Sequence, residues 1–292
     1  MPFVTATQRA SETVLTGVPS SSNTKARGVE HTAFEGRNVQ IGYQKLASTP
    51  GVGEIRTMFR RYVLRALDVD EARAFYREVA GLDFSAAPEK SGIEVWPLHE
   101  QARARGAPPH WLGQLAVVDV EAAVGRLLEL GAERLGPTVR GRDGAAFATL
   151  RDPLGAVVGV RESMPPPERT PVAWHHLNTR DLERAWTVYA ELFGWHHTET
   201  MEAADLEGGL RMFAWDRSGE TVGSIANTAR LPGVHTHWLF YFPVADLEAS
   251  LALVRAKGGK TLAPVVLPNG NRLAPCDDPQ GAAFGLFSSA QS

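Results

Sequence analysis

The stretch DLERAWTVYAELFG, from Asp181 to Gly194, has the pattern of one amphipathic helix. An aspartate at its start can accept hydrogen bonds from the free amides of the first turn, and a glycine at its end can take the left-handed conformation that terminates a helix. The apolar residues between them recur at helical spacing and would face a core: Leu182, Ala185, Trp186, Tyr189 and Leu192.

The same pattern occurs at three other places, namely Asp68–Gly81, Asp119–Gly131 and Asp246–Gly258. In chain order the aspartate and the glycine are 13, 12, 13 and 12 residues apart, so a unit with two helices has been duplicated. An alternating pattern typical of a strand precedes every helix, at Tyr62–Ala66, Leu112–Val117, Trp174–Thr179 and Leu239–Val244. We therefore expect four strand–helix modules arranged in two halves.

Two short motifs repeat between the halves. Asp-Pro-x-Gly-Ala begins at Asp152 and again 126 residues later at Asp278, and it predicts a tight turn into a last strand. His-Trp-Leu begins at His110 and again 127 residues later at His237. The first two helix-capping aspartates are 51 residues apart and the last two are 65 apart. The missing 14 residues predict that the first module lacks about one strand and its turn.

The composition is that of an ordinary globular protein, with 43% hydrophobic and 22% charged residues among 292. The net charge of −3 gives no attraction to nucleic acid, and no apolar run approaches the roughly 20 residues that cross a bilayer. A single cysteine, Cys276, excludes an internal disulfide and is typical of a reducing compartment. We therefore expect a cytoplasmic protein without nucleic-acid or membrane partners.

Two segments interrupt the modular pattern. Residues 1–57 are rich in Ser, Thr and Gly and lack apolar periodicity, which predicts a disordered leader. Met58 comes directly before the first strand pattern, and we hypothesise that it is the natural translation start. Residues 163–171 contain three consecutive prolines and are predicted to form a semi-rigid linker between two domains, at residues 58–162 and 172–290.

The order of these motifs resembles the vicinal oxygen chelate superfamily, which includes glyoxalase I, bleomycin-resistance proteins and extradiol dioxygenases. The residues that carry the resemblance are Asp68, Phe75, Tyr76, Gly81 and Leu82, then Asp181, Tyr189, Leu192, Phe193, Gly194 and Trp195, with both Asp-Pro-x-Gly-Ala endings. The resemblance covers about residues 58–289. It implies an α+β fold of four βαβββ modules, the first abbreviated, which pair into two curled mixed sheets with helices outside and a concave site in each.

Metal-dependent members of this family place a ligand, usually His, near the start of the first strand of a module and another, usually Glu, on the last strand. The positions that correspond in this sequence hold Arg61, Leu112, Trp174 and Leu239 on first strands, and Gly159 and Gly285 on last strands. None of these side chains ligates a divalent cation in the usual way. The departure from the family pattern predicts that no metal and no other cofactor is bound.

Strand alternation places Trp174, His176 and Asn178 on the cavity face of their strand, with Leu177 turned toward the helices. The same alternation places His237 and Tyr241 on the cavity face of the fourth module, and Arg61, His110 and Gln114 in the weaker site of the first half. Because the second half is also rich in aromatic residues, we expect it to hold the better-formed pocket for a small organic ligand.

Three hypotheses about function remain open on the sequence alone. The leading one is a metal-independent protein that binds a small molecule, with His176 and His237 as the weak candidates for acid or base catalysis if it is an enzyme. The alternative is a lyase, isomerase or dioxygenase in which zinc, iron or manganese binds these two histidines together with a carboxylate such as Asp205 or Glu207. The third is a scaffold for protein association. The sequence does not decide between a monomer and a homodimer.

Overall fold

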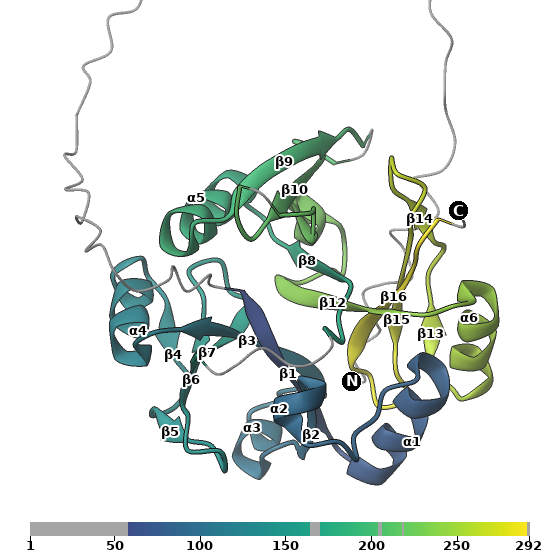
Figure 1. Ribbon diagram of the computed structural model, residues 1–292, viewed down its shortest axis with the longest axis horizontal. Coiled ribbons are helices and arrows are strands. Elements are labelled where there is room, and N and C mark those ends of the chain that lie inside the picture. Colours follow the sequence, from purple (N-terminus) through teal and green to yellow (C-terminus); the bar gives the residue numbers. More distant parts are fainter. Residues whose placement is uncertain (1–57, 164–169, 204–205, 218, 291–292) are drawn as a thin grey trace, which may run out of the picture.

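The computed structural model describes residues 58–163, 170–203, 206–217 and 219–290, and within these ranges the chain forms two mixed β-sheets (Figure 1). The predicted leader at residues 1–57 and most of the predicted linker, residues 164–169, lie outside the described residues. The helices lie around the periphery of the view, while β12 and β3 lie side by side at its centre.

The N-terminal sheet has the strand order β2-β1-β3-β7-β6-β4, and β5 pairs with β6 beside β4. Its strands are β1 (Phe59–Ala66), β2 (Ile93–Pro97), β3 (His110–Val117), β4 (Glu133–Arg134), β5 (Val139–Arg140), β6 (Ala146–Arg151) and β7 (Val157–Glu162). The helices of this half are α1 (Val69–Ala80), α2 (Pro88–Ser91), α3 (Glu100–Ala104) and α4 (Val120–Glu129).

The C-terminal sheet has the order β13-β15-β16-β12-β8-β11-β10-β9, with β14 also paired to β15. Its strands are β8 (Trp174–Asn178), β9 (His196–Met201), β10 (Leu210–Ala214), β11 (Gly223–Ala226), β12 (His237–Pro243), β13 (Lys260–Thr261), β14 (Val265–Val266), β15 (Arg272–Asp277) and β16 (Ala283–Ser288). The helices of this half are α5 (Leu182–Phe193), η1 (Asn227–Arg230) and α6 (Leu247–Ala256).

The modular prediction is confirmed by the pairing of the strands. In each of the four modules the first strand lies parallel to the last, as β1 with β2, β3 with β7, β8 with β11 and β12 with β16. The first strands of two modules then pair antiparallel at the centre of each sheet.

The first module is abbreviated as predicted, but it lacks two strands where the sequence predicted the loss of one. It contains only β1, α1 and β2 of the repeating pattern, so it lacks counterparts of both β9 and β10 rather than of one strand. The short helices α2 and α3 use the residues between α1 and β3 that do not join the sheet, and β2 therefore forms the outer edge of this half.

The four predicted aspartates all cap their helices. Asp68 accepts hydrogen bonds from the backbone amides of Asp70 and Glu71, and the other three aspartates each accept one from the residue three positions later. At the other end, Gly81 has a φ of 64° and ends α1 in the left-handed conformation that glycine adopts without strain. Local sequence therefore fixes where each long helix begins and ends.

The helices of all four modules pack on one face of each sheet, and the largest buried cluster joins the two halves. Phe59 of β1 stacks on His175 of β8, with ring centroids 5.4 Å apart. Tyr62 donates a hydrogen bond of 2.6 Å to Nε2 of His175, because the Nδ1 of that ring donates to the carbonyl of Val222. We call the opposite face of each sheet its inner face.

Two equivalent buried triads also connect the halves. Tyr76 of α1 donates to the carboxylate of Asp278 at 3.1 Å and accepts from the indole of Trp111 at 2.9 Å. In the same way Tyr189 of α5 donates to Asp152 at 2.7 Å and accepts from Trp238 at 2.9 Å. Each Asp-Pro-x-Gly turn thus lies against the first helix of the other half, which holds the two sheets in a fixed relation.

Candidate functional site

The inner face of the C-terminal sheet brings together the residues that strand alternation predicts there. An apolar cluster of this face contains Trp174, Leu239 and Tyr241, packed with Met212, Leu267 and Leu273 from both ends of the curled sheet. The residues that alternate with them face the helices, and these belong to the core shared by the two halves: Leu177 of β8 and Trp238, Phe240 and Phe242 of β12. The inner face is therefore largely apolar at the level of Trp174.

A polar group lies next to this cluster on the same face. Ser224 of β11 is fully buried, accepts a hydrogen bond from the indole of Trp174 at 3.2 Å, and lies 2.8 Å from Nδ1 of His176. One row further along, Thr228 donates to the Oδ1 of Asn178 at 2.6 Å, and the amide nitrogen of Asn178 lies 3.4 Å from Nε2 of His237. These bonds hold the polar side chains in fixed orientations.

The tautomer of His237 follows from its partners. Its Nδ1 lies 2.7 Å from the carbonyl of His235, which can only accept, so Nδ1 carries the proton and Nε2 accepts from Asn178. The pKa of both His176 and His237 is lowered to about 4, chiefly by burial. Repulsion by a nearby imidazole, His237 for His176 and His235 for His237, acts in the same direction. Both rings are therefore neutral near pH 7.

Asp277 was not among the predicted site residues. It lies in β15 on the same side of the strand as Leu273, is 4% exposed, and its Oδ2 has no hydrogen-bond partner within the described ranges. Burial raises the pKa of its carboxyl. A sequence signal was available, since Asp278 alone corresponds to the turn residue Asp152, which leaves Asp277 as an additional acid inside a strand.

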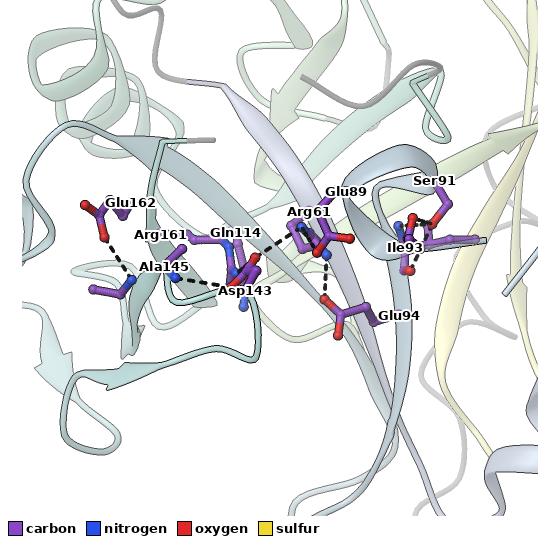
Figure 2. A network of polar contacts seen from close by, with 12 residues as sticks. Arg61, Glu89, Ser91, Ile93, Glu94, Gln114, Asp143, Ala145, Arg161 and Glu162 are labelled. Atoms are coloured by element: carbon purple, nitrogen blue, oxygen red, sulfur yellow. Dashed lines mark hydrogen bonds and ion pairs between the residues drawn. The ribbon is translucent and has the colours of Figure 1, made fainter. Parts of the chain in front are cut away.

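The inner face of the N-terminal sheet carries a network of charged side chains (Figure 2). The equivalent place in the C-terminal sheet is occupied by the apolar cluster around Trp174. Arg61 is 5% exposed and binds Glu94 at 2.7 Å, with Asp143 at 3.7 Å. Arg161 of β7 is bound to Asp143 and donates to the Oε1 of Gln114 at 3.4 Å. Of the residues predicted for this site, Arg61 and Gln114 belong to the network that Figure 2 shows.

His110, the third residue predicted for this half, lies at the start of β3 opposite Arg65 rather than opposite Arg61. Its Nδ1 lies 2.8 Å from the carbonyl of Pro108, and burial lowers its pKa. Among the described contacts it has no hydrogen bond to Gln114. Its place opposite Arg65 puts it at the end of the charged network.

Corresponding positions on the two inner faces form matching rows. Arg61, Gln114 and Gly159 lie side by side on β1, β3 and β7. In the other half Trp174, Tyr241 and Gly285 lie side by side on β8, β12 and β16. A Cβ atom added to Gly285 would lie 2.1 Å from the Tyr241 ring, and one added to Gly159 would lie 2.7 Å from Cγ of Gln114. Neighbouring side chains therefore fill the space that a last-strand ligand would need.

These residues do not fit a divalent cation. The two rows offer a guanidinium, an indole, a phenol and an amide, and the guanidinium would repel the ion. Among the described residues no three His, Cys, Asp or Glu side chains are grouped so that they could hold a metal. Asp205, one of the two carboxylates in the metal hypothesis, lies outside the described residues, and Glu207 is exposed and bound to Arg230.

Family models match both halves of the chain. A model described as Glyoxalase-like domain matches residues 61–160, and one described as Glyoxalase/Bleomycin resistance protein/Dioxygenase superfamily matches residues 172–286. The fold and its paired inner faces define a tandem protein of the vicinal oxygen chelate type. The chain belongs to the glyoxalase/bleomycin resistance/dioxygenase superfamily.

Two relatives show how far this likeness extends. CFP32 of Mycobacterium tuberculosis (strain CDC 1551 / Oshkosh), whose name proposes a glyoxylase without establishing one, is 30% identical over 247 residues, which cover 78% of this chain and 93% of CFP32. The anthracycline biosynthesis protein DnrV of Streptomyces peucetius is 30% identical over 129 residues, which cover 39% of this chain and 46% of DnrV.

Solved structures share the fold at low sequence identity. The Mn(II)-bound glyoxalase from Novosphingobium aromaticivorans has a TM-score of 0.55 at 14% identity and covers 80% of this chain and 82% of its own. The 2,3-dioxygenase LapB from Pseudomonas sp. KL28 has a TM-score of 0.54 at 12% identity, covering 81% of this chain and 93% of its own. At such identities the likeness concerns the fold alone.

None of the helices that the structure describes has the length and apolar character to cross a membrane.

Proposed function

We propose that this protein binds a small organic molecule, without a metal, on the inner face of the C-terminal sheet. The observation that carries the proposal is the junction of an apolar cluster around Trp174 with the hydrogen-bonded group of His176, Asn178 and His237. An apolar surface with a few fixed polar groups is the usual character of a site for small molecules.

The chemistry of the face favours an uncharged ligand with an aromatic or aliphatic body. Trp174, Leu239 and Tyr241 would contact the body, and the neutral ring of His176, whose Nδ1 faces Ser224, would form a hydrogen bond with a carbonyl or hydroxyl group through Nε2. His237 and Asn178 would hold each other in place beside the ligand. Because both imidazoles are neutral near pH 7, either could accept a proton if the ligand is turned over, whereas binding alone requires no catalytic group.

Ligand binding can be tested on the purified full chain. We expect a thermal-shift screen of neutral aromatic and aliphatic metabolites to give ligands that raise the melting temperature equally with and without a chelator. Those ligands should quench tryptophan fluorescence, and a His176→Ala, His237→Ala double variant should weaken them about tenfold, as expected for lost hydrogen bonds. A His196→Ala, His197→Ala double variant changes two histidines of β9 outside this group and serves as the matched control.

The competing metal hypothesis predicts a different result in the same preparation. Stoichiometric zinc, iron or manganese in the purified protein, lost in the His176→Ala, His237→Ala variant but retained in the control, would overturn the proposal. Screening that finds no ligand while the chain pulls down a protein partner would instead favour the scaffold. A cytoplasmic location, which the buried free Cys276 suits, is checked by cell fractionation.

A further inference from the structure

Two buried hydrogen-bond donors on the inner face of the N-terminal sheet have no acceptor among the described residues. Gln114 is 1% exposed, and its Oε1 accepts from Arg161, which fixes the amide so that Nε2 points elsewhere. That Nε2, and the Nε of Arg161, have no hydrogen-bond partner within the part of the chain that the structure describes. A buried donor without an acceptor is costly, so this pair is expected to meet an oxygen acceptor that the protein does not itself provide.

Among the largely buried groups around these donors, positive charge exceeds negative charge. Arg61 and Arg161 are nearly buried, and Arg65 lies on the same side of β1 as Arg61, with its guanidinium 4.5 Å from the ring centre of Trp96. Against these three cations stand two largely buried carboxylates, Glu94 and Asp143, whose side chains are 16% and 11% exposed. The third carboxylate, Glu89, lies 3.9 Å from Arg61 but is 47% exposed, so solvent screens its charge. An anionic acceptor is therefore favoured over a neutral one such as water.

The abbreviation of the first module leaves this face without the two strands that extend its counterpart. The C-terminal sheet continues past β11 to β10 and β9, whereas the N-terminal sheet ends at β2. Glu89, whose side chain is 47% exposed, lies 3.9 Å from Arg61 at this end of the network (Figure 2). A Cβ added to Gly159 would lie 2.7 Å from Cγ of Gln114, so no guest fits between these two residues.

We infer that the inner face of the N-terminal sheet binds a small carboxylate, with Gln114 Nε2 and Arg161 Nε as the donors to its oxygens. Arg61 and Arg65 contribute the surrounding positive charge, and Asp143 holds Arg161 in place. This site is separate from the proposed site of the C-terminal sheet and does not depend on it.

Acetate is the probe, and the readout is the side-chain amide signal of Gln114 in nitrogen-15 correlation spectra of the full chain. We expect acetate to shift this signal in a saturable way, with acetamide, its neutral analogue, binding at least tenfold more weakly. Chloride at the same ionic strength should leave the signal unchanged. The signal is assigned by its absence in Gln114→Glu.

Two variants test the donors by calorimetric titration with acetate. Gln114→Glu keeps an oxygen for Arg161 but replaces the Nε2 donor with an acceptor, and Arg161→Lys keeps the charge beside Asp143 but removes Nε. Each should weaken acetate by about ten- to thirtyfold, the range expected for one charge-assisted hydrogen bond. Gln101→Glu, the same change on an exposed residue of α3, should bind acetate as the wild type does.

The inference is wrong if acetate leaves the Gln114 signal unmoved, or if acetamide binds as well as acetate, since water or any neutral acceptor would then satisfy the donors. Equal acetate affinity in Gln114→Glu and wild type would also overturn it. Should Gln114→Glu fail to fold, the spectrum of the wild type and the Arg161→Lys titration still decide. Neither result bears on ligand binding at Trp174.

Discussion

The inner faces of the two sheets occupy equivalent places in a duplicated fold, yet they differ in chemistry. Where the C-terminal sheet has Trp174 beside Tyr241, the N-terminal sheet has Arg61 beside Gln114. The helix sides, by contrast, have kept matching residues, including both Tyr–Asp–Trp triads. Duplication has thus preserved the contacts that hold the sheets together, while the inner faces have diverged into one apolar and one charged surface.

The difference teaches how each inner face is stabilised. Ring packing on the C-terminal side gains free energy from removing apolar surface from water. The N-terminal side places charges out of water, and its stability depends on each charge keeping its partner. Variants at equivalent positions should therefore respond differently.

Arg61→Met is expected to have the largest effect. It removes the cation that binds Glu94 at 2.7 Å and leaves that partly buried carboxylate without its closest positive charge. We expect the free energy of unfolding to fall by about 3 kcal/mol, as is typical when one partner of a buried ion pair is removed. Denaturant unfolding at low and high salt measures the loss.

The equivalent change in the other half, Trp174→Met, alters no charge. It should cost less, and its cost should not depend on salt. A second variant sharpens the test, because Arg61→Met combined with Glu94→Met removes both charges and should recover part of the lost stability. If Arg61→Met unfolds like the wild type, the charged network does not stabilise this half.

Adding one methyl group at the two inner-face glycines gives the next comparison. In Gly285→Ala the new Cβ would lie 2.1 Å from the Tyr241 ring, a buried aromatic side chain with little room to move. We expect a loss of about 2–3 kcal/mol from overpacking. In Gly159→Ala the contact at 2.7 Å is with the flexible side chain of Gln114, so a loss of about 1 kcal/mol is expected.

Chemical denaturation of both variants measures this difference. Neither glycine has a positive φ, so backbone strain is the same in the two cases and packing alone separates them. Equal losses would mean that the Tyr241 ring and the Gln114 side chain move aside equally easily, so the two inner faces would not differ in rigidity.

Much of the fold could be predicted because its signals are local. The aspartate and glycine at the ends of each helix, and the alternation in β8 and β12, are patterns within one element. The contacts of Asp152 and Asp278 could not be predicted, since each carboxylate binds a tyrosine of the other half, 37 and 202 residues away. Sequence shows the turn that each aspartate begins but not the helix against which the turn lies.

For the inner-face residues too, local patterns could be predicted from the sequence, whereas partners far apart in the chain could not. Alternation correctly placed Trp174 and His176, because a strand of period two leaves only two choices. It did not reveal Arg161 and Asp143 as partners of the Arg61 region, because Asp143 lies in a loop and no spacing rule selects it. Whether these side chains bind ligands stays a prediction that the experiments above address.

The triad that contains Asp278 gives a prediction about pH. Burial raises the pKa of Asp278 to about 6, above the value near 3.9 for an unfolded aspartate. A carboxyl whose pKa is raised in the folded state contributes stability below the unfolded pKa, and that contribution is lost as pH rises through about 6. Asp278→Asn cannot ionise and should not show this loss.

We therefore expect the free energy of unfolding of the wild type, measured against Asp278→Asn, to fall by on the order of 2 kcal/mol between pH 4 and pH 7. Unfolding curves at several pH values within this window check it. A difference between the two proteins that stays constant with pH would show that folding does not raise the pKa of Asp278.

The smallest expected effect concerns the one turn residue at which the halves differ. The side chain of Gln280 accepts hydrogen bonds from the amides of Leu67 and Asp68 at 2.7 and 3.0 Å, and it donates to the carbonyl of Asp68 at 2.8 Å. Its counterpart, Leu154, packs against the shared core instead. Only the C-terminal turn thus holds the start of a helix in the other half.

Gln280→Leu gives the C-terminal turn the residue of the N-terminal one, and it should lower the free energy of unfolding by about 1 kcal/mol, since these hydrogen bonds are close to solvent. Hydrogen exchange is the sharper measurement, because the amides of Leu67 and Asp68 should lose protection while those inside α1 keep theirs. Unchanged protection at both amides would mean that water replaces the glutamine without loss. The bridge from the C-terminal turn would then contribute no more to the interface than the packing of Leu154 does on the other side.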